Sequence, residues 1–137
     1  MNKLITVAVI DSGIYPHIDF KNRIVAFKDF VNGRKNAYDD CGHGTHVSGI
    51  IAGSGYASHG RIKGICPAAR LAGIKVLDRL GNGRIENVLD STDWIISHQK
   101  DLNIRIVNIS FGATTFGEKE NLIALEKAIE KLWDLQI

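Results

Sequence analysis

The sequence predicts an α/β fold, a parallel sheet with crossover helices, and three observations lead to that fold class. Short, wholly apolar runs rich in β-branched residues are typical of parallel strands that are covered on both faces. Amphipathic segments with helical spacing lie between and after these runs. Strands that alternate with helices favour a parallel sheet with right-handed crossovers. With 137 residues, of which 45% are apolar and 23% charged, the chain is long enough to bury one core.

The first half of the chain predicts two strands and one helix. Leu4 to Ile10 is a β-branched run that fits a central strand, with Asp11 at its carboxyl end. Ile24 to Phe30 predicts a second, weaker strand, and a polar loop follows over residues 32–42. His43 to Ala52 has the small and apolar residues of a short buried helix, although helix propensity alone would not predict it.

The second half predicts two further strands, each followed by a helix. Leu71 to Val76 and Ile104 to Ser110 are apolar runs, and an amphipathic helix is expected between them over residues 85–100. A last amphipathic helix has its apolar residues on one face. These residues are Leu122, Leu125, Ile129, Leu132 and Trp133.

Two short phrases lie at the ends of predicted elements. Val9-Ile10-Asp11-Ser12-Gly13 ends the first strand, and Gly42-His43-Gly44-Thr45-His46-Val47 begins the first helix. In this order they resemble the aspartate and histidine motifs of the subtilisin-like serine proteases, the subtilase family. The resemblance implies that Asp11 and His43 are catalytic. A carboxylate orients the imidazole, which accepts the proton of a serine hydroxyl that is otherwise a poor nucleophile.

The resemblance also implies a subtilisin-like, three-layer fold of which residues 1–137 are the N-terminal part of the catalytic domain. The domain is then truncated after about the fourth strand and its following helix. The family places its nucleophile in a Gly-Thr-Ser phrase and its oxyanion asparagine after Ala-Gly, and neither phrase occurs in this sequence. We therefore expect this chain by itself to be inactive or nearly so. We expect the edge of the strand at residues 104–110 to pair with the C-terminal half of the protease or with a second copy of the chain.

Two segments resemble the family's substrate groove. Gly81, Asn82 and Gly83 follow the third strand, and Ser110, Phe111 and Gly112 follow the fourth. An extended polypeptide substrate would pair with accessible main chain there by adding a strand. In isolation each segment is simply a Gly-rich turn or a strand end, and their order after Asp11 and His43 favours the groove.

Metal sites are not predicted. Calcium is a cofactor in the family, but the loop that would hold it, residues 54–61, offers few side-chain oxygens, and Asp19 is a single carboxylate. His43 and His46 are three residues apart without the intervening Glu of a zinc protease helix, so no zinc is expected there. His46 is expected to be a packed, hydrogen-bonded histidine.

Charge and cysteine content bear on partners and location. The net charge is +2, and the charged residues are spread along the chain without runs. This pattern predicts no basic surface for nucleic acid or an anionic membrane. Cys41 and Cys66 favour a reduced compartment, with a single disulfide as the alternative. The apolar N-terminus runs directly into Asp11 instead of a cleavage site, which predicts a cytoplasmic protein. The alternative is a secreted protein, if Met1 is a start placed after a removed signal and pro-segment.

Two rival interpretations remain. A nucleotide-binding α/β domain would share the sheet, but the first strand is not followed by G-x-G-x-x-G, and no P-loop occurs. Within the family, the alternative is a non-catalytic truncated member that acts as a peptide-binding or assembly module.

Overall fold

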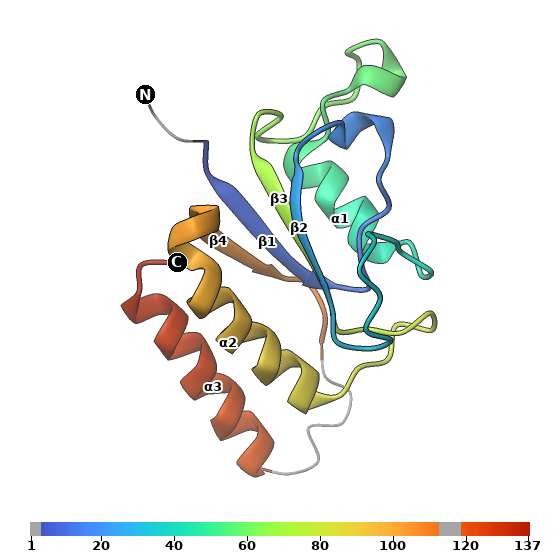
Figure 1. Ribbon diagram of the computed structural model, residues 1–137. Coiled ribbons are helices and arrows are strands. Elements are labelled where there is room, and N and C mark those ends of the chain that lie inside the picture. The colour runs from blue at the N-terminus through green and yellow to red at the C-terminus, as the bar shows by residue number, and fades with distance from the viewer. Residues whose placement is uncertain (1–3, 113–118) are drawn as a thin grey trace.

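Four parallel strands form one sheet in the computed structural model, which describes residues 4–112 and 119–137. The order across the sheet is β2-β3-β1-β4 (Figure 1). The strands are β1 (Thr6–Asp11), β2 (Ile24–Asp29), β3 (Arg70–Lys75) and β4 (Ile104–Ile109). All four predicted strands are confirmed within two residues at each end.

Helices cover both faces of the sheet, so the fold has three layers (Figure 1). On one face, Val7 and Val9 pack with residues of α1 (His43–Ala52). On the other face, Ala8 and Ile10 pack with residues of α2 (Ile85–Leu102) and α3 (Lys119–Asp134). The strict alternation along β1 follows from the two-residue period of a strand.

The helices begin and end near the predicted positions. The first helix begins at His43 and ends at Ala52, as predicted. The helix predicted over 85–100 continues to Leu102, where Asn103 adopts a left-handed conformation with φ of 53° and ends it. Two short 3₁₀ helices, η1 (Ile18–Phe20) and η2 (Tyr56–Ser58), were not predicted.

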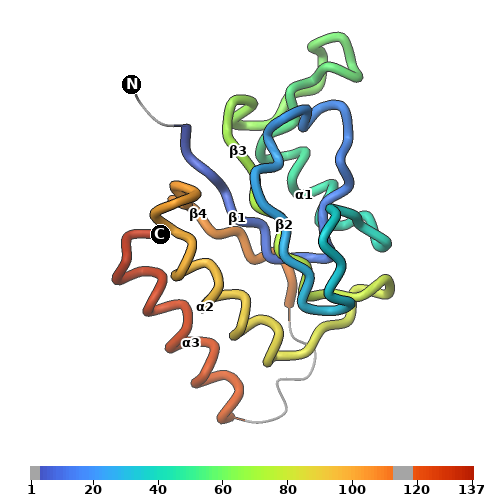
Figure 2. Tube along the Cα trace, viewed as in Figure 1, coloured from blue at the N-terminus to red at the C-terminus, as the bar shows by residue number. Residues whose placement is uncertain are grey.

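The last helix corrects one expectation. Helices α2 and α3 run side by side in the same direction (Figure 2). Helix α3 buries Ala128 and Leu132, and Leu132, with the partly buried Leu125, belongs to the core as predicted. Leu122, Ile129 and Trp133, predicted to share the packed face, have exposed fractions of 45%, 45% and 79%. The packed side of the helix is therefore rotated toward Ala128, a small residue that allows close approach.

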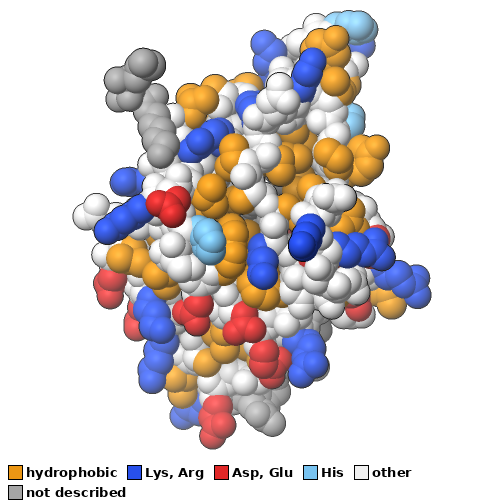
Figure 3. Space-filling view, viewed as in Figure 1, with side chains coloured by type: hydrophobic (Ala, Val, Ile, Leu, Met, Phe, Trp, Pro, Cys, Tyr) orange, Lys and Arg blue, Asp and Glu red, His pale blue; other side chains and the backbone are white. Residues whose placement is uncertain are grey.

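Charged side chains of both signs are interspersed over the face formed by α2 and α3 (Figure 3). In the described ranges, every helix is too short or too polar to cross a lipid bilayer. Met1, on which the expectation about the start of the chain depends, lies outside the described residues. Cys41 and Cys66 are both exposed free cysteines, so the alternative of a disulfide between them is not realised here.

Candidate active site

Asp11 is the last residue of β1, in the middle of the sheet and at its carboxyl edge. Its side chain is fully buried. Its main-chain oxygen accepts hydrogen bonds from the N–H groups of Val76 and Leu77 at 2.9 and 3.3 Å, which continues the pairing with β3 past the end of the strand. The carboxyl edge of an open parallel sheet is where such folds place their sites, and Asp11 is held there rigidly.

His43 is the first residue of α1, and its ring faces Asp11. Its Nδ1 lies 2.8 Å from Oδ1 and 3.0 Å from Oδ2 of that carboxylate. A carboxylate only accepts, so Nδ1 carries the proton and Nε2 is the nitrogen with a free lone pair. The His43 side chain is 48% exposed while that of Asp11 is 0% exposed. The pair thus joins a buried anion to an accessible base.

Two glycines allow the helix to approach the strand this closely. A Cβ at Gly44 would lie 2.2 Å from the Gly13 oxygen and 3.2 Å from Oδ1 of Asp11. Gly13 has φ of 124°, and a Cβ there would lie 2.2 Å from the Tyr38 oxygen. Only glycine fits at either position, because real Cβ atoms do not come within 3 Å of such oxygens.

A second carboxylate, Asp39, fixes the beginning of α1. Its Oδ2 accepts from the N–H and the hydroxyl of Thr45 at 2.9 and 2.6 Å, and its Oδ1 accepts from the hydroxyl of Ser12 at 2.9 Å. The Ser12 hydroxyl in turn accepts from the Gly44 N–H at 2.9 Å. Ser12 and Asp39 therefore act together as the cap that satisfies the first free N–H groups of the helix.

Electrostatics favours the ionised form of Asp39. Partial burial alone would raise its pKa, but hydrogen bonds from Thr45, Gly42 and Ser12 outweigh this and hold the pKa below the usual range. Ser12 and Asp39 were not predicted from the sequence as site residues. The available signal was their position: Ser12 follows Asp11 directly, and Asp39 precedes His43 by four residues in a polar loop.

The two predicted groove segments lie on either side of Asp11. The segment with Gly81, Asn82 and Gly83 follows β3, and the segment with Ser110, Phe111 and Gly112 follows β4. Because β3 and β4 are the two neighbours of β1, parallel pairing brings both segments to the same edge. The six residues thus follow the two strands that flank Asp11, and their role as a groove stays a prediction.

The first of these segments has a defined turn. Leu77 and Gly83 form an antiparallel bridge, and the Asp78 carboxylate accepts from the N–H groups of Leu80 and Asn82 at 2.8 and 3.0 Å. Hydrogen bonds from Asn82 and then Leu80 lower the pKa of Asp78. Residues 79–84 are exposed, which leaves their main chain accessible.

A cation site at the 54–61 loop does not fit the residues present. The Asp19 carboxylate is already used, since its Oδ1 accepts from the Ala57 N–H at 2.8 Å. Residues 4–112 and 119–137 contain no group of three His, Cys, Asp or Glu side chains placed to hold a metal. The residues of this loop therefore do not form a calcium site that a reaction could use.

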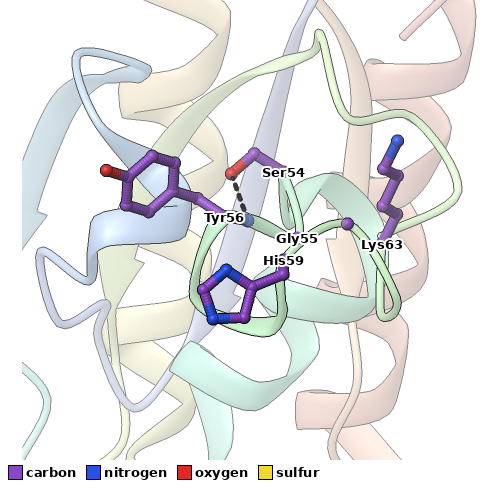
Figure 4. A pocket seen from close by; sticks show the side chains of 6 residues that line it. Ser54, Gly55, Tyr56, His59 and Lys63 are labelled. Atoms are coloured by element: carbon purple, nitrogen blue, oxygen red, sulfur yellow. Dashed lines mark hydrogen bonds between the residues drawn. The ribbon is translucent and has the colours of Figure 1, made fainter.

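Neither of the two larger hollows around the 54–63 loop is built like a polar ligand site. One, of about 480 Å³, lies over that loop, and the Lys63 side chain there points away from those of Tyr56 and His59 (Figure 4). A second hollow, of about 420 Å³, is largely apolar and is lined by Ile50, Ile62 and His46 among others. His46 is exposed, so the prediction of a packed histidine is wrong: the ring lies on the outer side of α1.

The whole described chain is similar to known serine proteases. A family model described as "Subtilase family" matches residues 2–135. Serine protease AprX of Bacillus subtilis is 40% identical over 98% of this chain, and minor extracellular protease Epr of the same organism is 42% identical over 94%. A crystal structure of a cold adapted subtilisin-like serine proteinase superimposes with a TM-score of 0.72 at 30% identity, over 92% of this chain.

The matched part of each of these proteins is a minor share of its length. The chain spans 31% of AprX, 19% of Epr and 42% of the cold adapted proteinase.

Proposed function

The chain belongs to the subtilase family of serine proteases, and from that premise we propose that it supplies the aspartate and the histidine of an Asp-His-Ser endopeptidase. The observation that carries the proposal is the hydrogen bond of 2.8 Å between His43 Nδ1 and the buried Asp11 carboxylate. Residues 1–137 form the N-terminal part of the catalytic domain. The serine and the oxyanion asparagine come from polypeptide outside this sequence.

In this proposal His43 is the general base and then the general acid. Its Nε2 takes the proton of the serine hydroxyl as the serine oxygen attacks the peptide carbonyl, and it later gives that proton to the departing amine. Asp11 keeps the proton on Nδ1 and stabilises the imidazolium that forms between the two steps. Asp11 itself stays ionised throughout.

The substrate is an extended polypeptide that lies between two walls. One wall is Gly81, Asn82 and Gly83, and the other is Ser110, Phe111 and Gly112. Support comes from the accessible main chain of the first wall and from the position of both walls at the edge of the sheet that carries Asp11.

Two surfaces of this chain are proposed to be covered by other polypeptide. One is the open edge of β4, residues 104–110, which pairs with the C-terminal half of the protease or with a second copy of this chain. The other is the outer side of α1, where Ile50, Ile62 and Ile65 have exposed fractions of 55%, 75% and 88%. Apolar side chains that gather next to a candidate site in this way mark a surface that another part of the protein contacts.

The second candidate function is a non-catalytic module that binds peptides or assembles with other chains. The observation in its favour is the exposed main chain of residues 79–84, which could pair with a peptide without any catalytic group. Asp11 and His43 would then be relics, whereas the groove and the β4 edge would be functional. The cytoplasmic location also stays a prediction, supported by two free cysteines and set against one relative whose name describes it as extracellular.

A fluorophosphonate separates these functions, because it forms a phosphorus–oxygen bond with an activated serine as fluoride leaves. We expect intact-mass analysis to show no adduct on the purified chain alone. In an extract of the source organism, we expect an adduct on a partner polypeptide or on a longer product that carries this sequence. Labelling of the chain alone would mean that one of its own serines is activated and that the proposal is wrong.

A matched pair of variants assigns the base. The complemented protease is this chain together with the polypeptide that supplies the serine. In it, His43→Ala should lower kcat by about 10⁴-fold or more, the scale known for this family. His59→Ala, an exposed histidine in the 54–63 loop, should leave kcat unchanged. Undiminished turnover of the His43 variant would refute the assignment of His43 as the general base.

A further inference from the structure

Lys75 is a charged residue in the core. It ends β3, directly beside Asp11 in the register of the sheet, and its side chain is 0% exposed. A buried ammonium is costly unless it is paired and fully hydrogen-bonded. A lysine kept at this position therefore needs an explanation that the Asp11–His43 pair alone does not give.

The ammonium has three partners, each from a different part of the site. It donates to the Ser12 oxygen at 2.6 Å, to the Leu77 oxygen at 2.7 Å and to Oδ1 of Asp40 at 2.7 Å. Ser12 follows Asp11 on β1. Leu77 begins the groove segment, where it pairs with Gly83. Asp40 lies in the loop that leads to His43.

These contacts use the full capacity of the group. An ammonium has three N–H donors and no acceptor, and all three are taken, while the Tyr38 ring lies 5.1 Å from Nζ. Lys75 is therefore unsuited to act as a base toward a nucleophile, since it has neither a free lone pair nor a path to solvent. Its contacts suit it to hold main chain in place.

We propose that Lys75 is a positioning residue that ties the Asp11 strand, the His43 loop and the groove segment at residues 77–83 into one junction. The proposal rests on the function proposed above, because it treats Asp11 and His43 as the reacting pair and residues 81–83, which Leu77 holds through its bridge to Gly83, as a groove wall. Neither the cap formed by Asp39 nor the pairing of β1 with β3 reaches all three segments.

Two substitutions remove different sets of the Lys75 hydrogen bonds. Lys75→Met keeps the length and apolar stem of the side chain but removes all three bonds. Asp40→Ala removes only the arm to the His43 loop and leaves both carbonyl contacts, and the Asp40 side chain is 36% exposed, so this variant is expected to fold. Lys28→Met, on the neighbouring strand β2 and exposed, is the matched lysine control.

The first measurement uses the purified full chain and needs no hydrolysis. In the proton spectrum, a His43 Nδ1–H that is bonded to a carboxylate gives a downfield resonance. We expect both Asp40→Ala and Lys75→Met to shift or broaden this resonance, and only Lys75→Met to shift the amide resonances of Gly81 and Gly83 as well. Lys28→Met should change neither set.

The second measurement uses the complemented protease. Asp40→Ala should lower kcat at least about tenfold with KM unchanged, whereas Lys75→Met should lower kcat and also raise KM for long peptides, since a displacement of about 1 Å in such a site costs up to about 100-fold. An unchanged Nδ1–H resonance in folded Asp40→Ala would overturn the proposal, even if Lys75→Met fails to fold. If the resonance is lost in Asp40→Ala but the extract yields no labelled partner and no labelled longer product, the proposed function is refuted and the junction still stands.

Discussion

Asp39 shows how one side chain sets the position of another without contacting it. The carboxylate accepts hydrogen bonds from Ser12, Cys41, Gly42 and Thr45, and those residues belong to the end of β1 and to both sides of His43. The position of His43 relative to Asp11 is therefore fixed by a residue that contacts neither.

Replacement of Asp39 by asparagine tests this arrangement. The amide keeps one acceptor oxygen, so at least the two bonds from Thr45 or the bonds to Oδ1 are lost. We expect the free energy of unfolding to fall by about 1–3 kcal/mol, the range for buried hydrogen bonds to a charged group, as measured by urea denaturation. Asp90→Asn, on the exposed face of α2, should change the free energy of unfolding by less than about 0.5 kcal/mol. Equal stability of the two variants would contradict the assigned role.

Among single residues, the sequence predicts those that belong to a contiguous motif. Asp11 and His43 are recognisable because Gly13, Gly44 and Thr45 stand next to them in a fixed order. Lys75 and Asp39 were not identified, because their roles depend on contacts between residues that are 27 to 63 positions apart. His46 was assigned wrongly because a helical position next to the site does not reveal which side of the helix faces the sheet.

The position of the helix α1 depends on its close approach to β1. Substitutions at its two internal glycines, Gly44 and Gly49, measure the effect of that approach separately from the effect of helix propensity. We expect Gly44→Ala to lower the free energy of unfolding by about 1–3 kcal/mol and to weaken the Asp11–His43 contact, because the new methyl group would overlap the Gly13 oxygen. Gly49→Ala has no atom within 4 Å of the new methyl group and should stabilise the helix by up to about 1 kcal/mol. Thermal denaturation of both variants measures the difference. A stabilised Gly44 variant would show that the approach is looser than described.

Elements were predictable to the extent that their pattern is local. The four strands are short, mostly apolar runs, and the pattern at 85–100 has one apolar face, so strand and helix could be told apart. The packed side of α3 could not be fully predicted. The large apolar residues Leu122, Ile129 and Trp133 suggest one side of the helix, but the side that carries the small Ala128 is the buried one. Which side is buried depends on how closely α2 approaches. The 3₁₀ turns η1 and η2 have no periodic signal at all.

The stability of the whole molecule should depend on acid pH chiefly through two carboxylates, Asp29 and Asp39. The pKa of Asp78 is lowered too, but this carboxylate lies at the surface, where solvent screens its contribution. Burial alone would raise the pKa of Asp29, but hydrogen bonds from Asn32, Tyr38, Val31 and Arg34 lower it, and Asp39 is lowered in the same way. A carboxylate whose pKa is lower in the folded state stabilises that state fully above the unfolded pKa of about 3.9. This stabilisation is lost as the pH falls through the folded pKa.

We therefore expect the melting temperature to be insensitive to these two groups between about pH 5 and pH 7 and to fall below about pH 4. The slope below pH 4 should be shallower in Asp39→Asn, because one of the two carboxylates no longer titrates. Calorimetric scans over that range measure both slopes. Parallel curves for the two proteins would show that Asp39 does not contribute to the acid transition.

At the scale of the whole molecule, we propose that the open edge of the sheet governs association. A strand with an unpaired edge is a template for another chain, and in β4 Ile106 is 47% exposed while β1 is its only neighbouring strand among residues 4–112 and 119–137. We expect sedimentation equilibrium of the purified chain to show self-association that increases with concentration. Ile106→Lys should weaken this association at least about tenfold, since a lysine on an edge strand opposes pairing. Ile18→Lys carries the same change at a residue that is 45% exposed in η1, away from the edge, and should leave association unchanged. If the unmodified chain stays monomeric at all concentrations, and an extract yields neither a serine-bearing partner nor a longer product that carries this sequence, β4 is not a pairing edge and the proposal that Asp11 and His43 act with a serine is wrong.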